Sequence, residues 1–410
     1  MSSRRVVITG MAGISPIGNN WTDAERALRA RRNAVRYMDE WADISGLRTC
    51  LGAPAAPFEL PAHYTRKRTR SMGRVALLAC LASEWALADA GLLEDPILKS
   101  GRTGVSYGSS LGEPGAAIDF AQLIKGRSLD GLTANSYLRM MAHTAPANIS
   151  VFFGLTGRLI PTSSACTSGS QGIGYAYEAI RFNFADVMLA GGTDELCASE
   201  AGVFDALLAT SRRNDAPATT PRPYDRDRDG LVIGEGASTF ILEELEHARA
   251  RGARIIAEIV GFGTNSDGAH VTQPHAETMA TALRLALADA GLPAEAIGYV
   301  NGHGTATELG DIAESHATHA VFGEKIPISS LKSYVGHTLG AAGAIEAWLT
   351  VEMMRAGWFA PTLNLDNVDP RCAPLDYVRE EGRAIECDYT MSNNFAFGGI
   401  NTSLIFKRWS

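Results

Sequence analysis

The chain has 410 residues, 46% of them hydrophobic and 20% charged, which is enough for a large buried core and about two to three domain-sized units. A formal net charge of −8 excludes a chain-wide electrostatic affinity for nucleic acid or anionic lipid, so an anionic partner needs a local basic patch. The 42 glycines exceed average usage and indicate tight turns between strands and helices.

Targeting signals and metal-binding patterns are missing from the sequence. The longest apolar-rich run, residues 75–93, is interrupted by Ser83, Glu84 and Asp89 and predicts an amphipathic helix instead of a membrane span. The apolar run at residues 6–10 is too short for a signal peptide, so we expect a cytoplasmic protein. The six cysteines are scattered without CxxC spacing, which argues against a disulfide framework and a zinc module.

Short runs of β-branched or small residues that end in Gly or Ser predict buried strands. They lie at residues 6–10, 103–108, 186–192, 239–243, 298–302 and 403–406. Helix-length segments occupy residues 75–91, 167–184, 276–291, 310–322 and 339–356. This alternation is typical of an α/β fold with a largely buried sheet. It begins again after a charged helix end at residues 243–254, so we expect two similar halves, residues 1–252 and 253–410.

The sharpest local feature is a strand at residues 159–162 that turns abruptly into a helix of small residues. Cys166 lies at this turn, where the helix dipole and unpaired N–H groups favour a thiolate and lower the cysteine pKa. The same N–H groups can hold an oxyanion during acyl transfer. The alternative is a small buried apolar residue at a tight turn, as free cysteines commonly are.

Two histidines lie in glycine-rich turns of the second half, His303 after a predicted strand and His337 before a predicted helix. Little apolar surface surrounds either histidine. The sequence therefore supports a functional role and a structural role equally for each of them. Lys332 is one of only six lysines in the chain, which favours a role that arginine cannot fill over an ordinary surface position. Glu346 interrupts an apolar helix stripe and could be solvated or could pair with Lys332.

Other patterns are weaker. Residues 108–112 match G-x-S-x-G, the serine-hydrolase elbow, but Pro114 fits poorly with a helix after Ser110. His316 and His319 share a predicted helix face without a carboxylate or cysteine cluster that would complete a metal site. The sequence has no P-loop and no G-x-G-x-x-G after a strand, so we expect neither a metal nor a cofactor.

Together, the turns around Cys166, His303 and His337 and the closing segment NNFAFGGIN at residues 393–401 resemble the β-ketoacyl-[acyl-carrier-protein] synthases. These are the elongating condensing enzymes of the thiolase superfamily. The resemblance runs from residue 6 to residue 407. It implies a thiolase-like layered αβαβα fold from two fused similar halves, assembled as a homodimer or as a heterodimer with a related ketosynthase-like subunit.

The resemblance also implies a reaction. Cys166 would carry an acyl chain as a thioester, and His303 and His337 would stabilise the enolate formed when malonyl-[acyl-carrier protein] loses CO₂. The product would be 3-oxoacyl-[acyl-carrier protein]. The resemblance further implies an oxyanion hole from the N–H groups of Cys166 and Phe397, with Phe397 also the gate of the acyl tunnel, and an ion pair between Lys332 and Glu346. It adds Gly398 and Gly399 beside the gate, and Thr305 and Thr307 as hydroxyls that hold the pantetheine arm. It also adds residues that contact the substrate, Leu111, Phe204 and Thr272, and the polar residues Asp267 and Asp311.

Three stretches depart from the usual family motifs. Glu308 and Leu309 follow the sequence HGTAT at residues 303–307. Tyr334 and Val335 lie between the KS and the GH of the motif that ends at His337. Asn394, Ala396 and Ile400 replace the usual Ser, Gly and Thr of the family motif NSFGFGGTN. None of the changes removes a catalytic group. They leave two pathways open: fatty-acid elongation, or an aryl polyene or polyketide cluster in which this chain is the active subunit beside an inactive chain-length partner.

Acyl carrier proteins are acidic and phosphopantetheinylated, and the resemblance places their docking near residues 64–74. This run carries five positive residues and no acid. We expect docking at Arg66, Lys67, Arg68 and Arg70, against the alternative of a solvated helix start; weaker candidates are Arg127, Arg212 and Arg213. Two other functions are a Ser110 hydrolase, for which the sequence offers no Asp/His partners, and a non-catalytic interaction subunit, against which the retained cysteine and histidines argue.

Overall fold

The computed structural model describes residues 4–410. Its core is a mixed sheet of 11 strands. Across the sheet the strands are β13 (Asp376–Tyr377), β11 (Pro327–Ser329), β10 (Ile297–Asn301), β15 (Tyr389–Ala396), β16 (Ile400–Arg408), β9 (Ala257–Ser266), β1 (Val6–Ile14), β8 (Gly236–Glu244), β6 (Val187–Asp194), β4 (Thr103–Gly108) and β5 (Leu159–Thr162). Two small sheets combine β2 (Arg36–Tyr37), β3 (Leu51–Ala53) and β7 (Ile233–Gly234), and β12 (Trp358–Phe359) with β14 (Arg383–Ala384).

Helices cover the sheet and fill the space between its two parts. They are α1 (Trp21–Arg29), α2 (Arg66–Thr69), α3 (Arg74–Asp89), α4 (Ala117–Gly126), α5 (Ala134–Met140), α6 (Thr144–Phe153), α7 (Ser168–Arg181), α8 (Ala198–Ala206), α9 (Leu245–Ala250), α10 (Ala276–Ala290), α11 (Glu308–Phe322), α12 (Lys332–Val335) and α13 (Ala342–Ala356). Among residues 4–410, no helix has the length and apolar character needed to cross a bilayer.

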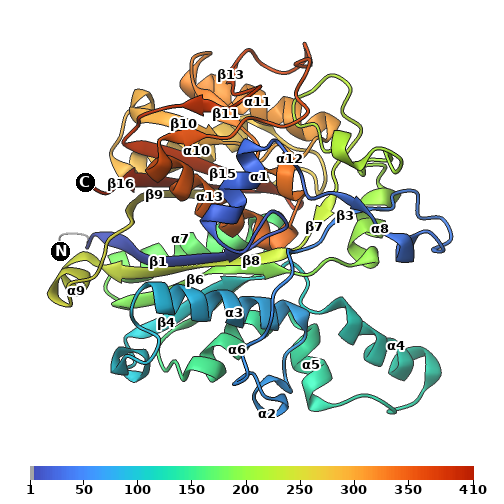
Figure 1. Ribbon diagram of the computed structural model, residues 1–410, viewed down its shortest axis with the longest axis vertical. Coiled ribbons are helices and arrows are strands. Elements are labelled where there is room, and N and C mark those ends of the chain that lie inside the picture. Colours follow the sequence, from blue (N-terminus) through green and yellow to red (C-terminus); the bar gives the residue numbers. More distant parts are fainter. Residues whose placement is uncertain (1–3) are drawn as a thin grey trace.

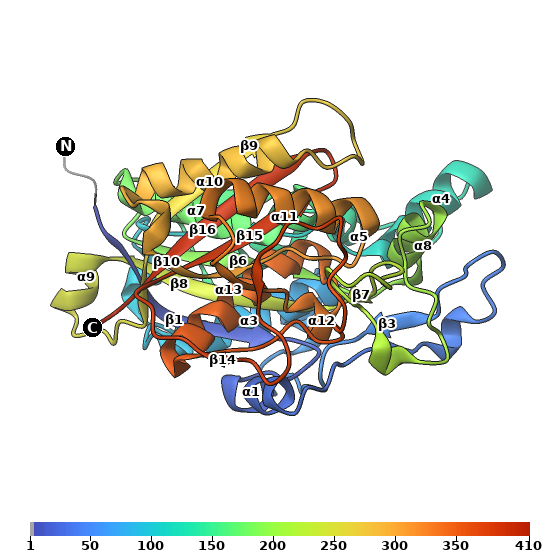
Figure 2. The same cartoon turned by 90° about the horizontal axis from the view of Figure 1, so that it is seen from above.

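The elements form five layers (Figure 1). The outer helices α3 and α6 pack on β1, β8, β6, β4 and β5, all from the first part of the chain. The central helices α7 and α13 lie between these strands and those of the second part. In the view from above, α10 lies over β9 and β16, and α11 packs beside α10 (Figure 2). The predicted αβαβα layering is therefore confirmed.

The two parts of the sheet meet at β1 and β9. Only three residue pairs join these strands, from Val6↔Ile259 to Ile8↔Ala257, whereas β1 pairs with β8 along its length. The sequence predicted that the first strand ends at Gly10, but it continues to Ile14. A Cβ at Gly10 would lie 2.4 Å from the carbonyl oxygen of Ala86, and one at Gly13 would lie 2.2 Å from the Trp348 ring. These glycines allow close packing against helices instead of forming turns.

Candidate active site

Cys166 lies on a tight connection between β5 and α7. A short 3₁₀ turn, Ala165–Thr167, links the two elements, and Ala165 adopts a positive φ of 50°. The Ser168 hydroxyl accepts the N–H of Ser164 (2.9 Å) and donates to the carbonyl of Ala165 (2.7 Å). These bonds fix the turn so that Cys166 faces the interior, where 4% of its surface is exposed.

The Cys166 sulfur is surrounded by hydrogen-bond donors. His337 Nε2 lies 3.0 Å from Sγ, and the backbone N–H groups of Phe397 and of Cys166 itself favour the thiolate form. Burial nevertheless raises the pKa of the thiol to about 12, although the Lys332 ammonium and both N–H groups act in the opposite direction. The predicted lowering of the pKa is therefore wrong, because loss of solvation outweighs the donors.

The backbone around His337 fixes which ring nitrogen carries its proton. The His337 N–H donates to the carbonyl of Val232 (2.7 Å), which anchors the turn after α12. The Leu339 N–H donates to His337 Nδ1 (3.2 Å). Because Nδ1 accepts this bond, a neutral ring carries its proton on Nε2 and directs it at the Cys166 sulfur.

His303 is held in the loop after β10 by an acid on α11. Glu314 accepts the backbone N–H groups of His303 (2.5 Å) and Gly304 (2.6 Å). The Nδ1 atom of the His303 ring lies 3.0 Å from Nζ of Lys332. An ammonium only donates, so this nitrogen accepts, and the proton of the neutral ring again lies on Nε2.

An ion pair buried behind His303 supplies that ammonium. Lys332 bonds to Glu346, and each side chain is 1% exposed. The second Glu346 oxygen accepts the Nδ2 amide of Asn394 (2.7 Å). Burial raises the pKa of Glu346, while Lys332 lowers it. The structure thus pairs Glu346 with Lys332 instead of leaving it solvated.

Both imidazoles are neutral. Burial lowers the pKa of each histidine well below 6.5, and Lys332 lowers both further. The rings lie 5.2 Å apart in an edge-to-face arrangement. Among the described residues, Cys166, His303 and His337 form the group whose side-chain donor atoms approach one another closely enough to hold a metal ion, within 4.8 Å. A metal would have to displace both Nε2 protons, so the site is better suited to hydrogen-bond donation.

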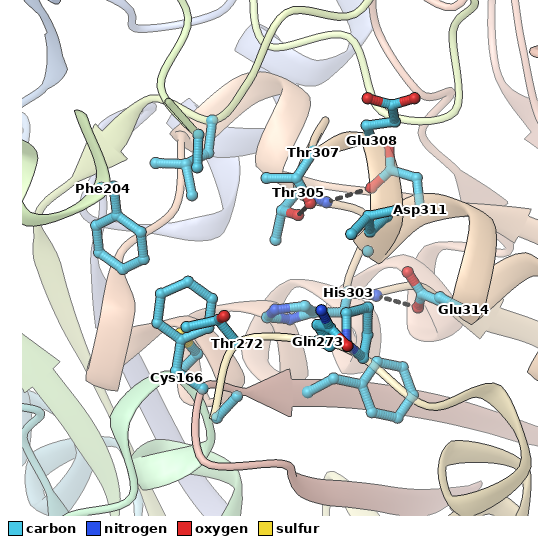
Figure 3. Close-up of a pocket in the computed structure, with 18 of the residues that line it drawn as sticks. Cys166, Phe204, Thr272, Gln273, His303, Thr305, Thr307, Glu308, Asp311 and Glu314 are labelled. Carbon is cyan, nitrogen blue, oxygen red and sulfur yellow. Dashed lines mark hydrogen bonds between the residues drawn. The ribbon is translucent and has the colours of Figure 1, made fainter. Parts of the chain in front are cut away.

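These groups open into a cavity of about 570 Å³. Cys166, His303 and His337 line its floor, and Phe204, Thr272, Thr305, Thr307 and Phe397 are among its other lining residues; most of these are labelled in Figure 3. The Phe204 and Phe397 rings lie 5.2 Å apart, and the hydroxyls of Thr305 and Thr307 lie 2.9 Å apart. The site therefore combines a thiol, two N–H donors, aromatic walls and a pair of hydroxyls.

Comparison with known proteins identifies the chain. Residues 3–248 match the family model of the Beta-ketoacyl synthase N-terminal domain, and residues 256–366 match that of its C-terminal domain. The chain belongs to the β-ketoacyl synthase family. It is 38% identical over 100% of both chains to the 3-oxoacyl-[acyl-carrier-protein] synthase 2 of Vibrio cholerae. The crystal structure of a beta-ketoacyl synthase from Burkholderia phymatum has a TM-score of 0.98 at 60% identity, covering 99% of this chain and 100% of that one.

Two further solved structures contain a synthase with a partner. A type II polyketide ketosynthase in complex with its acyl-carrier protein has a TM-score of 0.90 at 28% identity and covers 100% of both chains. A ketosynthase in complex with its chain length factor, from Xenorhabdus doucetiae, has a TM-score of 0.83 at 27% identity, with 99% of this chain and 98% of that one covered. The present synthase is thus a condensing acyltransferase with the thiolase-like fold.

The glycines after Phe397 connect this segment to a neighbouring loop. Gly398 donates to the carbonyl of Val271, and Asp267 donates its N–H to the carbonyl of Gly399, both at 2.7 Å. A Cβ at Gly399, which has a φ of +69°, would lie 2.7 Å from that of Asp267. The approach between the two loops therefore depends on glycine at this position.

Asp311 organises the loop that bears the two threonines. Its Oδ1 accepts the N–H groups of Thr305 (3.0 Å) and Ala306 (3.1 Å). Burial raises the Asp311 pKa to about 6, against the opposing effect of Arg228. Asp311 and Glu314 are three residues apart on α11 and both support this loop; the sequence singled out Asp311 alone, although the helical spacing of the two acids was a usable signal.

Four residues singled out from the sequence lie elsewhere. Leu111 is 49% exposed and does not line the cavity. The Ser110 N–H donates to Asp194 (3.1 Å), and the described residues place no histidine in hydrogen-bond contact with Ser110. His316 contacts the backbone of Arg371, and neither it nor His319 belongs to a potential metal cluster of the described chain.

The basic run forms an exposed patch around α2. Arg66, Lys67, Arg68 and Arg70 all face solvent, and the Arg68 guanidinium stacks 3.8 Å from the centre of the Phe152 ring. Arg74, which the sequence counted with them, is bound to the buried carboxylate of Glu235 instead, so it is not part of this patch. Of the weaker candidates, Arg127 and Arg212 are exposed, and Arg213 donates to the carbonyl of Asp227.

Proposed function

We propose that Cys166 takes the acyl chain in this condensing reaction. Its thiol attacks the carbonyl carbon of an acyl-carrier thioester, the bond to the carrier sulfur breaks, and the thiol proton leaves with the carrier. The N–H groups of Cys166 and Phe397 favour negative charge at the thiol, which supports their role as the oxyanion hole. One such donor commonly contributes about 3 kcal/mol to transition-state stabilisation.

In the second half-reaction the malonyl group loses CO₂, and the electrons of the broken C–C bond form an enolate. The Nε2–H groups of His303 and His337 hydrogen-bond to the enolate oxygen. The enolate carbon then attacks the acyl-Cys166 carbonyl, the C–S bond breaks, and the thiolate regains a proton from water. Neutral donors suit this step because decarboxylation generates the carbanion without a strong base.

The observation that carries this proposal is the convergence of one thiol and two imidazoles within 4.8 Å, with both Nδ1 atoms occupied by donors. The test is to mix the protein with acyl-carrier and malonyl-carrier and to measure the 3-oxoacyl product and the intact mass of the enzyme. The Cys166→Ala variant should form neither product nor acyl-enzyme, whereas Cys387→Ala, at a cysteine outside the cavity, should form both. A Cys166→Ala protein that still condensed would exclude the proposal.

The geometry also argues against a non-catalytic subunit. Such a chain needs no aligned donors, yet Lys332, Glu346 and Glu314 bury three titratable groups to hold the ring and the backbone of His303. Burying charge is costly unless it is paired. Malonyl decarboxylation by the purified protein distinguishes the two functions.

We further propose that an acidic acyl carrier protein docks on the patch Arg66, Lys67, Arg68 and Arg70. The support is the charge of this patch and the carrier complex of the polyketide ketosynthase described above. Charge reversal at Lys67 and Arg70 should raise the KM for carrier-bound substrate several-fold and leave reaction with a small thioester unchanged. Lys325→Glu, at another exposed lysine, is the matched control; an equal effect there would contradict a local docking site.

We also propose that the protein is a dimer, either of two copies or with a ketosynthase-like partner. Within the described chain β5 is an edge strand that pairs with β4 alone, and Leu159 on β5 and Val151 on α6 remain exposed. An open edge with apolar neighbours favours pairing with another chain. Native mass spectrometry of the protein purified with its natural neighbours distinguishes the two assemblies and the monomer that would contradict both.

The two halves of the chain, residues 1–252 and 253–410, divide the chemistry in this proposal: the first supplies Cys166 and the second supplies both histidines.

A polyene or polyketide pathway is the second candidate for the function, supported by the motif departures and by the ketosynthase with a chain length factor. Intact-mass analysis of Cys166 after exposure to a mixed pool of acyl carriers separates saturated chains from polyene or polyketone chains.

A further inference from the structure

A buried amide contacts the charged groups behind His303. Asn394 lies on β15 and is fully buried. It stands where the family motif usually has serine. Its Nδ2 atom lies 2.7 Å from Glu346 Oε2 and 3.5 Å from His303 Nδ1. A side chain that contacts both the acid and the ring is placed to influence how that ring is protonated.

The hydrogen-bond donors around Glu346 and His303 allow one arrangement of protons in this cluster. One Glu346 oxygen is bonded to Lys332 and the other to Asn394, so a donor from a different strand or helix fixes each oxygen. Around His303 Nδ1 the two polar neighbours are Lys332 Nζ and Asn394 Nδ2. An ammonium and an amide NH₂ group are both hydrogen-bond donors. A proton on His303 Nδ1 would oppose these donors, so Nδ1 stays unprotonated.

The backbone of α13 sets the orientation of the amide. A Cβ added at Gly343 would lie 2.7 Å from Asn394 Oδ1, so the oxygen occupies space that exists because position 343 is glycine. The amide oxygen has no hydrogen-bond partner among the described residues. Reversing the amide would set this oxygen against the Glu346 carboxylate, so the nitrogen faces the acid.

We propose that Asn394 is a positioning residue for malonyl decarboxylation, which keeps the Glu346–Lys332 pair aligned and reserves the His303 proton for Nε2, the atom that faces the substrate. This inference rests on the proposed role of His303. Serine cannot fully replace the Asn394 side chain in this role. A hydroxyl has one proton and a shorter reach, whereas the amide presents two donors in one plane.

The test compares three substitutions in two half-reactions measured separately. Asn394→Leu removes both donors at similar volume, Asn394→Ser restores one, and Asn394→Asp replaces the donor with an acid facing Glu346. Malonyl-carrier decarboxylation is followed by CO₂ release, and acylation of Cys166 is followed by intact mass. Among the described residues, Asn394 forms no hydrogen bond with Cys166 or His337, so a positioning role predicts that decarboxylation alone is affected.

We expect kcat for decarboxylation to fall at least tenfold in Asn394→Leu, to recover partly in Asn394→Ser, and to fall furthest in Asn394→Asp. The KM for malonyl-carrier and the rate of Cys166 acylation should stay within about twofold of the wild type. Asn393→Ser is the matched control, because the adjacent Asn393 is also buried and neither atom of its amide has a partner in the described chain. It should leave both half-reactions unchanged.

Several results would overturn the inference. Equal slowing of both half-reactions in Asn394→Leu and Asn394→Ser would indicate general damage to β15. Wild-type decarboxylation in Asn394→Leu would show that the amide has no role. If Asn394→Asp and Asn394→Leu do not fold, the serine variant decides alone: a normal decarboxylation kcat would contradict the need for two donors. Absence of decarboxylation in the wild-type protein would instead refute the proposed function itself.

Discussion

The two histidines reach the same protonation state by different means. His337 receives its Nδ1 hydrogen bond from a backbone N–H, whereas His303 receives it from Lys332, which is itself held by Glu346. A backbone donor comes with the fold and carries no net charge. A side-chain donor brings buried charge that must be balanced, but it also raises the positive potential of the cavity. Substitution should therefore disrupt the His303 side more readily than the His337 side.

The largest effect should come from removing either ring. His303→Ala and His337→Ala should each lower malonyl decarboxylation roughly 10²–10³-fold, the usual loss for one oxyanion donor. Of the two histidines in the described chain, only His337 forms a hydrogen bond with the Cys166 sulfur, so His337→Ala alone should also slow acylation of Cys166. Carbon dioxide release and intact mass, measured side by side, check this difference; equal slowing of acylation in both variants would contradict it.

Lys332→Met removes the donor from the His303 side and leaves Glu346 without a cation. Breaking a buried ion pair in this way commonly costs about 3–5 kcal/mol of unfolding free energy. Decarboxylation should fall as well, while the contact between His337 and Cys166 persists. Denaturant unfolding measures the stability. An unchanged free energy of unfolding would show that water or a neighbouring side chain compensates Glu346.

The pH dependence of decarboxylation tests how Lys332 controls the protonation of both rings. A neutral ring is the active form, and burial together with Lys332 keeps both histidine pKa values well below 6.5. The wild-type rate should therefore stay level as the pH falls through 6.5, provided that the protein remains folded. Without Lys332 both histidine pKa values rise, so a folded variant should lose activity at a higher pH than the wild type. Identical acid limbs would show that Lys332 does not control the rings.

The smallest effect concerns the loop that bears His303. Tyr224 Oη donates to Glu314 Oε2 (2.9 Å), the oxygen that also accepts the Gly304 N–H. Tyr224→Phe removes one of these bonds at nearly constant volume and should cost about 1 kcal/mol of stability. Decarboxylation should decrease only a few-fold. Thermal unfolding and CO₂ release measure both, and a loss as large as that of His303→Ala would mean that the loop depends on this single hydroxyl.

Local patterns predicted much of the secondary structure but not the strand that joins the halves. The predicted helix at 276–291 corresponds to α10 (Ala276–Ala290), because its apolar periodicity is unbroken. The strand β9 (Ala257–Ser266) was not predicted. Its Gly261 and Gly263 interrupt the β-branched pattern, yet they allow α10 to approach, since a Cβ at Gly263 would lie 2.2 Å from the carbonyl oxygen of Ala282. These glycines are required by the packing of the helix on the strand, so strand propensity alone does not reveal β9.

The residues of the site were found from the sequence more readily than their electrostatics. The turn of Cys166 and the rarity of Lys332 are visible along the chain. The pKa of Cys166, however, depends on burial beneath His337 and Phe397, which lie far away in sequence. Asn394 was noticed only as a departure from a motif, because its contact with Glu346 exists only once β15 and α13 meet.

The position of β1 has a consequence for synthesis of the chain. This strand is made before its partners β8 and β9, with which it forms pairs such as Val6↔Glu244 and Val6↔Ile259. The central sheet therefore cannot close until both of these strands have been made. Until then the apolar face of β1 stays available to other chains, and such non-local pairing is slow. Nascent chains that end before β9 should accordingly depend most on chaperones.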